Sequence, residues 1–235
     1  MKIVAVVRCF NEINNIHRFI HGYSFADKII ISDGGSTDGS IELLQQLEDR
    51  YAHLDKIHVH YFKEQKTVNG QLWNDDNPHI QYVIDLGKAQ NPDWIIFDDM
   101  DCVPNYELRT NARRLLEETE HNQVNAFRLY MWGDNEYFPL MNNHFDPNYV
   151  SLWAWKPAER NIYADINQHH GTVLGLDDNH LKILPPMCLL HKSWHPDTID
   201  AKIARYTAVG INMNHPLGFA GAPTALPEWA REDEI

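Results

Sequence analysis

The chain has 235 residues and a formal net charge of −13 at pH 7, with 43% hydrophobic and 11% aromatic residues. This length suits one α/β domain, and the apolar content is sufficient for a core. The negative charge disfavours non-specific binding to nucleic acids and anionic membranes, whereas a divalent cation would meet a compatible field.

The first half of the chain alternates predicted strands with predicted helices. Apolar runs predict strands at 2–7, 28–32, 56–62, 93–97 and 125–132. Helical spacing predicts helices at 11–23, 40–51, 78–90 and 105–119. We expect Ser36, Thr37 or Asp38 to cap the second helix and Asn77 to cap the third. This alternation favours a mostly parallel sheet with helices on both faces.

The second half is less regular. From about residue 133 the pattern loosens into a His- and Trp-rich region, which is followed by a predicted helix at 197–209. The tail from His215 is rich in Pro, Gly and Ala and then acidic, which is typical of a lid or a disordered end.

Cysteine usage and hydropathy indicate the compartment. The three cysteines, Cys9, Cys102 and Cys188, show no C-x-x-C spacing, which is typical of reduced thiols. The apolar run at the start is too short for a signal peptide, and no stretch approaches membrane-spanning length. We therefore expect a cytoplasmic protein without a transmembrane segment.

Three polar clusters follow predicted strands: RCFNE (8–12), SDGGSTDGS (32–40) and DDMD (98–101). Ligands of parallel sheets bind beyond the carboxyl ends of the strands, so we expect the clusters to share one edge. Asp33 ends a strand and could accept hydrogen bonds from a base or ribose, while the glycines allow close backbone approach. A capped turn that binds no ligand is an equally common interpretation.

The DDMD stretch places three carboxylates within four residues. Such carboxylates repel one another unless something positive lies among them. At a strand-end turn one carboxylate could bind a hard cation directly, and another could hydrogen-bond a sugar or a metal-bound water. A cation held in this way usually shares its shell with substrate phosphates. A solvated acidic loop is the alternative, but the position directly after an apolar strand favours a functional site.

The segments VVRCFNE, KIIISDGGSTDGS and DWIIFDDMD occur in an order and spacing that resemble family 2 glycosyltransferases of the GT-A fold. The resemblance covers about the first half of the chain. It implies that Asp33 contacts the base of a nucleotide-sugar donor, that Asp101 binds Mn²⁺ or Mg²⁺, and that Asp99 lies nearer the donor sugar. Gly34 departs from the pattern, because many members carry a second Asp there.

The same resemblance implies a wider set of site residues. The donor-binding residues would be Asn11, Glu12, Asp33, Asp38, Asp99 and Lys66. The usual arginine before the D-x-D strand is not evident, and Lys66 or Lys88 could replace it. The metal ligands would be Asp101, Asp99 and His191, since CLLHKSW followed by DAKIARY resembles the late histidine and basic helix of some members. A histidine packed on Trp194 is an equally good interpretation of His191.

Catalysis by an inverting transferase requires a carboxylate that takes the acceptor proton. We expect Asp165 to be this base, with Asp177 or Asp178 and then Glu136 as alternatives, and Asp99 as a second catalytic acid. His169 or His170 could face the same site. Several tryptophans could stack on sugars or pack in the core; they are Trp73, Trp132, Trp153, Trp155 and Trp194.

The sequence therefore predicts one GT-A domain over residues 1–235. Its parts would be a nucleotide-sugar-binding half (1–104), an acceptor-side half (105–214) and a tail or lid (215–235). The expected activity is metal-dependent transfer of a hexosyl or pentosyl group to a glycan, a protein or a small molecule, with a nucleic acid less favoured. Two other functions fit: a haloacid-dehalogenase-like phosphatase, because IIFDDMDCV also matches its motif, and a non-catalytic sugar-binding module.

Overall fold

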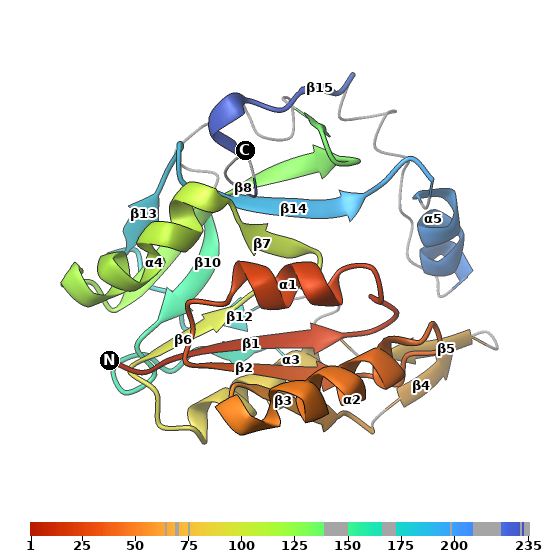
Figure 1. Ribbon diagram of the computed structural model, residues 1–235, viewed down its shortest axis with the longest axis horizontal. Coiled ribbons are helices and arrows are strands. Elements are labelled where there is room, and N and C mark those ends of the chain that lie inside the picture. Colours follow the sequence, from red (N-terminus) through yellow and green to blue (C-terminus); the bar gives the residue numbers. More distant parts are fainter. Residues whose placement is uncertain are drawn as a thin grey trace.

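A computed structural model describes residues 1–63, 65–68, 71–74, 76–138, 150–165, 173–197, 199–208, 222–230 and 232. Its main sheet has the strand order β15-β9-β8-β10-β6-β1-β2-β3 (Figure 1). Four of these strands form a parallel half: β1 (Ile3–Cys9), β2 (Lys28–Asp33), β3 (Ile57–Tyr61) and β6 (Trp94–Phe97). These are the first four strands that the apolar runs predict.

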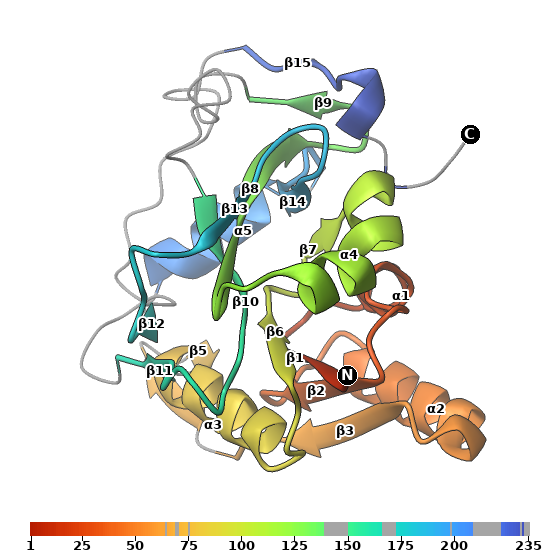
Figure 2. The ribbon, with the colours of Figure 1, turned by 90° about the vertical axis from the view of Figure 1, so that its left-hand side faces the viewer.

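The parallel strands are buried on both faces. Val4, Val6 and Ile30 belong to a core cluster with α3 (Asp76–Lys88), whereas Ala5 and Val7 belong to a second cluster with α1 (Ile16–Gly22) and α2 (Ser40–Tyr51). Figure 2 shows α3 on one side of these strands and α1 and α2 on the other. Burial on both faces explains why the strands read as continuous apolar runs.

The second half of the chain extends the sheet with mixed strand directions. The antiparallel strand β10 (Val150–Trp155) lies between β6 and β8 (Gln123–Trp132). Strands β13 (Leu181–Ile183) and β14 (Leu189–Trp194) run parallel to β8. β14 also pairs with β7 (Cys102–Pro104), the short strand that directly follows the DDMD turn. The sequence from 133 onward therefore forms more strand than its irregular pattern indicates.

The remaining elements are short or peripheral. Asn105 caps α4 (Tyr106–Glu118), and α5 (Ile199–Ala208) forms within the predicted last helix. Two hairpins stand apart from the main sheet: β4 (Gln65–Val68) with β5 (Gln71–Asn74), and β11 (Tyr163–Ala164) with β12 (Val173–Leu174). Within the predicted tail, β15 (Thr224–Ala225) pairs with β9 (Glu136–Tyr137), and the 3₁₀ turn η4 (Glu228–Ala230) follows. A second 3₁₀ turn, η1 (Ala52–Leu54), extends α2.

Two predicted helix starts and the predicted capping residue of α2 are wrong, whereas α2 begins at Ser40 as predicted. Helix α1 begins at Ile16 and not at residue 11, because Asn11 has a φ of 58° and turns the chain first. Gly39, with a φ of 97°, is the N-cap of α2 in place of the three predicted residues. Helix α3 begins at Asp76, and the side chain of Asn77 donates to the main-chain oxygen of Asp165.

Two compositional expectations can be compared with the described residues. Cys9, Cys102 and Cys188 are buried free thiols. None of the helices within the described ranges is both long enough and apolar enough to cross a membrane.

Candidate functional site

The three polar clusters lie at one edge of the parallel strands, as predicted. Strands β1 and β2 run in register, so that Cys9 is paired with Asp33, and β6 ends at Phe97, level with Val6. In Figure 1 the arrowheads of β1, β2 and β14 point toward the side of the molecule on which α5 lies. Parallel strand ends thus bring together residues that are far apart in the sequence.

The loop after β1 is tied to the turn after β2 by hydrogen bonds. The Oδ1 atom of Asn11 accepts from the main-chain N–H of Thr37 (2.8 Å), and the N–H of Asn11 donates to Ser36 Oγ (2.8 Å). The N–H of Glu12 donates to Ser40 Oγ (3.1 Å). Asn and Asp tolerate the left-handed backbone conformation better than most residues, which suits Asn11 to this position. The two clusters therefore form one fixed unit.

Asp33 is fully buried and organises its own turn. Its Oδ1 accepts from the N–H groups of Gly35 (2.7 Å) and Ser36 (2.8 Å), and its Oδ2 accepts from Ser36 Oγ (2.6 Å). The thiol of Cys9, which is paired with Asp33 across β1 and β2, also forms a side-chain hydrogen bond with this carboxylate. The role of Asp33 in contacting a nucleotide base stays a prediction.

Asp38 likewise accepts hydrogen bonds that fix the backbone at the start of α2. Its Oδ1 accepts from the N–H (3.0 Å) and the hydroxyl (2.6 Å) of Ser40, and its Oδ2 accepts from the N–H of Ile13 (3.1 Å). Partial burial favours the neutral acid, but these hydrogen bonds outweigh it and lower the pKa of Asp38 below its ordinary value. Asp38 is therefore an ionised residue that joins both loops.

The side chain of Asp98 points into the protein core and is not placed to bind a metal ion. It is 1% exposed and accepts from Tyr23 Oη (2.6 Å), from the N–H of Asp99 (3.0 Å) and from Arg128 Nη2 (2.9 Å). Burial raises the pKa of Asp98 to about 6, although Arg128 opposes the shift. One of the three crowded acids is thus part of the packing beneath the site.

The other two acids meet His191. Ligand atoms of Asp99, Asp101 and His191 all lie within 4.8 Å of one another. The convergence is possible because β6 has ended at Phe97, so that Asp99 and Asp101 no longer alternate across a strand. Pairing of β14 with β7 places His191 opposite Cys102, next to the acidic turn. These are the three metal ligands that the sequence resemblance implies.

Asp101 remains ionised in this cluster. Burial alone would raise its pKa, but His191, whose Nε2 lies 3.3 Å from Asp101 Oδ1, holds the pKa well below its ordinary value. Lys202 on α5 adds to this effect, with its Nζ 3.8 Å from Asp101 Oδ2. An ionised carboxylate beside an imidazole is ready to bind a hard or borderline cation.

Three basic side chains surround the cluster, and the sequence analysis assigned none of them. Arg128 Nη1 lies 3.3 Å from Asp99 Oδ2, Arg8 Nη2 lies 3.6 Å from Asp99 Oδ1, and Lys202 approaches Asp101. The sequence contains a sign of the role of Arg128, because a single charged residue within the apolar run NAFRLYMW must have a buried partner. The protein itself therefore supplies part of the positive charge that the crowded acids require.

The donor set fits a divalent cation. Two carboxylates and one imidazole suit Mn²⁺ better than Ca²⁺, whose ligands are oxygens. In addition, His191 Nδ1 is buried without a hydrogen-bond partner in the part of the chain that the structure describes. The other ring nitrogen, Nε2, faces Asp101 Oδ1 and is the nitrogen that a cation at the cluster would meet.

Asp165, the predicted base, lies near the carboxyl end of β2. Its main-chain oxygen accepts from Asn77 Nδ2 (2.6 Å). Two residues after Asn77, His79 Nε2 lies 2.8 Å from Ser32 Oγ, and Ser32 precedes Asp33 on β2. Asp165 is not one of the three clustered ligands, and its catalytic role stays a prediction. His169, His170 and the side chains of Lys66 and Trp73 lie outside the described residues.

Some alternatives lie elsewhere. Lys88 Nζ donates to the main-chain oxygen of Ile162 (2.9 Å), which makes it a structural contact and not a replacement for the missing arginine. Asp177 pairs with Arg160 (2.6 Å) and binds Gln123 at the start of β8. The cluster of Asp99, Asp101 and His191 lies beside Arg128. Arg128 is five residues after Gln123 on β8, which corresponds to about 16 Å along the strand. Asp178 and Glu136 are exposed.

The tryptophans divide between the core and the site. Trp153 and Trp155 are fully buried, so they pack in the core. Trp194 is partly exposed and stacks with Tyr130 at a centroid distance of 5.6 Å, and Tyr130 meets the edge of His191 at 5.1 Å. An aromatic surface thus adjoins the cluster of Asp99, Asp101 and His191 on the β8–β14 side.

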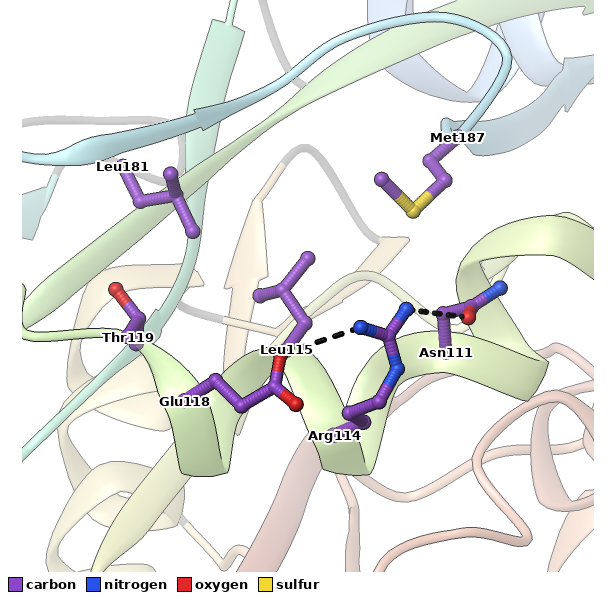
Figure 3. A pocket seen from close by; sticks show the side chains of 7 residues that line it. All are labelled: Asn111, Arg114, Leu115, Glu118, Thr119, Leu181 and Met187. Carbon is purple, nitrogen blue, oxygen red and sulfur yellow. Dashed lines mark hydrogen bonds and ion pairs between the residues drawn. The ribbon is translucent and has the colours of Figure 1, made fainter.

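A separate hollow of about 300 Å³ lies between α4 and β13 (Figure 3). Leu115, Leu181 and Met187 contribute its apolar side chains, and Arg114 on its rim bonds Glu118 and Asn111. Leu181 pairs with Val124 at the opposite end of β8 from the acid cluster. This hollow is therefore separate from the candidate site.

Comparisons with known proteins bear on the fold. The chain matches no family model and no curated protein. Among solved structures it resembles the mannosyltransferase PcManGT from Pyrobaculum calidifontis in complex with GDP-Man and Mn²⁺, with a TM-score of 0.53 and 12% identity, over 92% of this chain and 66% of that one. TarS 1–349 of S. aureus aligns with a TM-score of 0.40 and 16% identity, over 56% of this chain and 36% of that one.

The first of these likenesses shows the fold. The chain has the α/β fold of a glycosyltransferase, with a curled, largely parallel sheet flanked by helices, which confirms the predicted GT-A class. The chain spans slightly less than two thirds of the length of PcManGT and about a third of the TarS chain.

Proposed function

We propose that this protein transfers a sugar from a nucleoside-diphosphate sugar to an acceptor hydroxyl, with a divalent cation bound by Asp99, Asp101 and His191. The observation that carries the proposal is the convergence of these three side chains at the carboxyl ends of the parallel strands. Within a glycosyltransferase fold, this is where a donor would bind. We place the protein in family 2 on the DGGSTDGS turn and the D-x-D motif, and in the cytoplasm on its thiol content.

The donor class is supported from two directions. The carboxyl edge of β1 and β2 offers Asn11, Glu12, Asp33 and Asp38 for the nucleoside, in a unit that hydrogen bonds hold rigid. PcManGT, whose fold this chain shares, has been solved with GDP-Man and Mn²⁺. We extend the class of ligand, a nucleotide sugar with manganese or magnesium, to this protein and leave the sugar open.

The diphosphate would meet cations that are already at the site. Arg8 and Lys202 lie 3.6 and 3.8 Å from the carboxylates, beyond hydrogen-bonding distance. Both would place positive charge next to the phosphate oxygens. Lys66 on β4 would complete this set. The bound cation would offset the charge that develops on the leaving diphosphate.

The reaction breaks the bond between the anomeric carbon and the diphosphate oxygen, whose electron pair leaves with the nucleoside diphosphate. The acceptor oxygen forms the new bond to the anomeric carbon, and its proton passes to a base. We assign the base to Asp165, at the same edge of the sheet. Asp99 would orient the donor sugar. Trp194 and Tyr130 offer the adjacent surface on which an acceptor could rest.

Two observations disfavour the phosphatase. Its nucleophilic aspartate belongs after the first strand, whereas β1 ends at Cys9 and the D-x-D follows β6. The acids that would form its late motif, Asp177 and Asp178, lie about 16 Å along β8 from Arg128.

Thermal unfolding with GDP or UDP, with and without Mn²⁺, tests the proposal. A nucleotide at one hundred times its Kd stabilises by about 2.7 kcal/mol, and the shift should require Mn²⁺. Asp101→Asn should abolish the metal-dependent part, whereas Glu118→Gln, on the exposed face of α4, should not. No stabilisation by either nucleotide with Mn²⁺ in the wild-type protein would refute the function.

A further inference from the structure

Arg18 on α1 connects three segments that are far apart in the sequence. Its Nε lies 2.8 Å from Glu232 Oε2 in the C-terminal segment. Its Nη1 donates to the main-chain oxygen of Asp101 (3.2 Å), and its Nη2 donates to the main-chain oxygen of Leu190 (3.2 Å). The Arg18 side chain is 12% exposed, so these contacts are shielded from water.

Lys192 reinforces the same junction from β14. Its N–H donates to the main-chain oxygen of Asp101 (2.8 Å), which therefore accepts from both basic residues. Its Nζ lies 3.3 Å from Glu232 Oε2 and 3.0 Å from Asp134 Oδ1. Glu232 thus pairs with the side chains of both Arg18 and Lys192. Each of these two residues also donates a hydrogen bond to the main-chain oxygen of Asp101.

The C-terminal segment reaches this place because it is packed over β7 and the start of α4. Asn105 Nδ2 donates to the main-chain oxygen of Trp229 (2.8 Å), and Ala230 is fully buried. Upstream, β15 pairs with β9. Figure 1 shows η4 in the upper part of the molecule, with β8 and β14 nearby. The described part of the tail is therefore seated on the body of the protein, two residues before Glu232.

Arg18 contacts the backbone of one proposed metal ligand and of the residue that precedes another. Asp101 is itself a ligand, and Leu190 directly precedes His191. The guanidinium has a fixed planar geometry, so it sets the spacing between the two carbonyl groups and hence between the two ligands. Glu232 neutralises that guanidinium and orients it from the other side.

We propose that Arg18 and Glu232 are positioning residues through which the C-terminal segment holds Asp101 and His191 in cation-binding geometry. This inference rests on the proposed function, because it concerns the same metal cluster. Supporting residues around metal ligands typically change metal affinity by 10- to 100-fold when they are removed. Neither Arg18 nor Glu232 needs to touch the cation or the substrate.

The test is titration of the full chain with Mn²⁺ alone, followed by the electron paramagnetic resonance signal of free Mn²⁺. Glu232→Gln should weaken Mn²⁺ binding by about tenfold, and Arg18→Lys should do the same, because an ammonium cannot hold three acceptors in a plane. The exposed ion pair Arg114–Glu118 provides matched controls. Arg114→Lys and Glu118→Gln should leave Mn²⁺ affinity unchanged.

Thermal unfolding of the metal-free variants separates positioning from general stability. Positioning predicts weaker Mn²⁺ binding at temperatures at which the variants are fully folded, with Glu232→Asp retaining more affinity than Glu232→Gln. Wild-type affinity in folded Glu232→Gln and Arg18→Lys would overturn this inference and leave the proposed function standing. Absence of Mn²⁺ binding in the wild-type protein would overturn both.

Discussion

Arg128 and Asp98 form a buried ion pair beneath the proposed metal site, with Nη2 2.9 Å from Oδ1 and the carboxylate 1% exposed. The same guanidinium reaches Asp99 at 3.3 Å, so one strand side chain joins the inner acid to a proposed metal ligand. The pair fixes where the acidic turn begins. Its cost is the desolvation of both charges, which their mutual contact and the hydrogen bonds of Asp98 to Tyr23 and to the N–H of Asp99 offset.

Removing Arg128 should therefore be strongly destabilising. Arg128→Met leaves Asp98 buried beside Asp99 without a compensating charge, and we expect a loss of about 3 to 5 kcal/mol in the free energy of unfolding. Urea unfolding at pH 7 would measure it. Adding Asp98→Asn should recover part of the loss, because an amide needs no counter-charge. Strict additivity of the two changes would contradict a coupled pair.

At Asn11, substitution by glycine should destabilise the protein less than substitution by alanine. With a φ of 58°, Asn11→Ala combines backbone strain with loss of the bond to Thr37, at a cost of about 2 kcal/mol. Asn11→Gly loses the same bond without the strain and should cost about 1 kcal/mol less. Thermal or urea unfolding would rank the two variants. A glycine variant less stable than the alanine variant would contradict the strained turn.

His79 should make the protein less stable in mild acid. It is fully buried and stacks on Phe62 with a centroid distance of 4.6 Å. Burial, aided by the charge of Arg8, lowers the pKa of His79 to about 3. The unfolded chain binds a proton near pH 6.5 that the folded protein does not bind until about pH 3. Stability is thus fully present above pH 6.5 and is lost as the pH falls toward 3.

His79→Gln keeps a polar group near Ser32 but cannot titrate. Between pH 7 and pH 5 the wild-type protein should lose about 2 kcal/mol more than this variant, whatever their difference at pH 7. Urea unfolding at the two pH values measures both losses. Equal losses would mean that His79 does not contribute to the acid sensitivity.

Asp165 is tested by turnover and not by stability. Asp165→Asn should keep nucleotide and Mn²⁺ affinity but reduce transfer by about 10² to 10⁴, since an amide cannot take the acceptor proton. Its main-chain bond to Asn77 is unaffected by this change, so the loop should keep its position. Calorimetry of the donor product together with a transfer assay would separate the two effects. Weakened nucleotide binding with normal transfer would assign Asp165 to the donor side instead.

Sequence alone could predict the parallel half of the sheet and the edge at which the clusters meet. Runs such as KIIIS and DWIIF are buried on both faces, so their apolar character is continuous, and the polar residues that follow must lie at strand ends. Asp99 and Asp101 were identifiable because three acids directly after a buried strand are costly without a function. The prediction failed where a left-handed residue decided the turn: Asn11 delays the start of α1, and Gly39 is the N-cap of α2.

Tertiary structure alone decided how the acids are divided and what holds them. The D-x-D spacing sets Asp98 apart from Asp99 and Asp101, but only the tertiary structure shows that Asp98 is buried against Tyr23 while Asp99 lies beside His191. Arg128, Lys202 and Arg18 reach the acidic turn through contacts between segments 29 to 101 residues apart, which follow from the tertiary fold and not from local pattern. The site depends on charges that long-range packing of strands and helices brings together, and a single sequence carries no local signal of that packing.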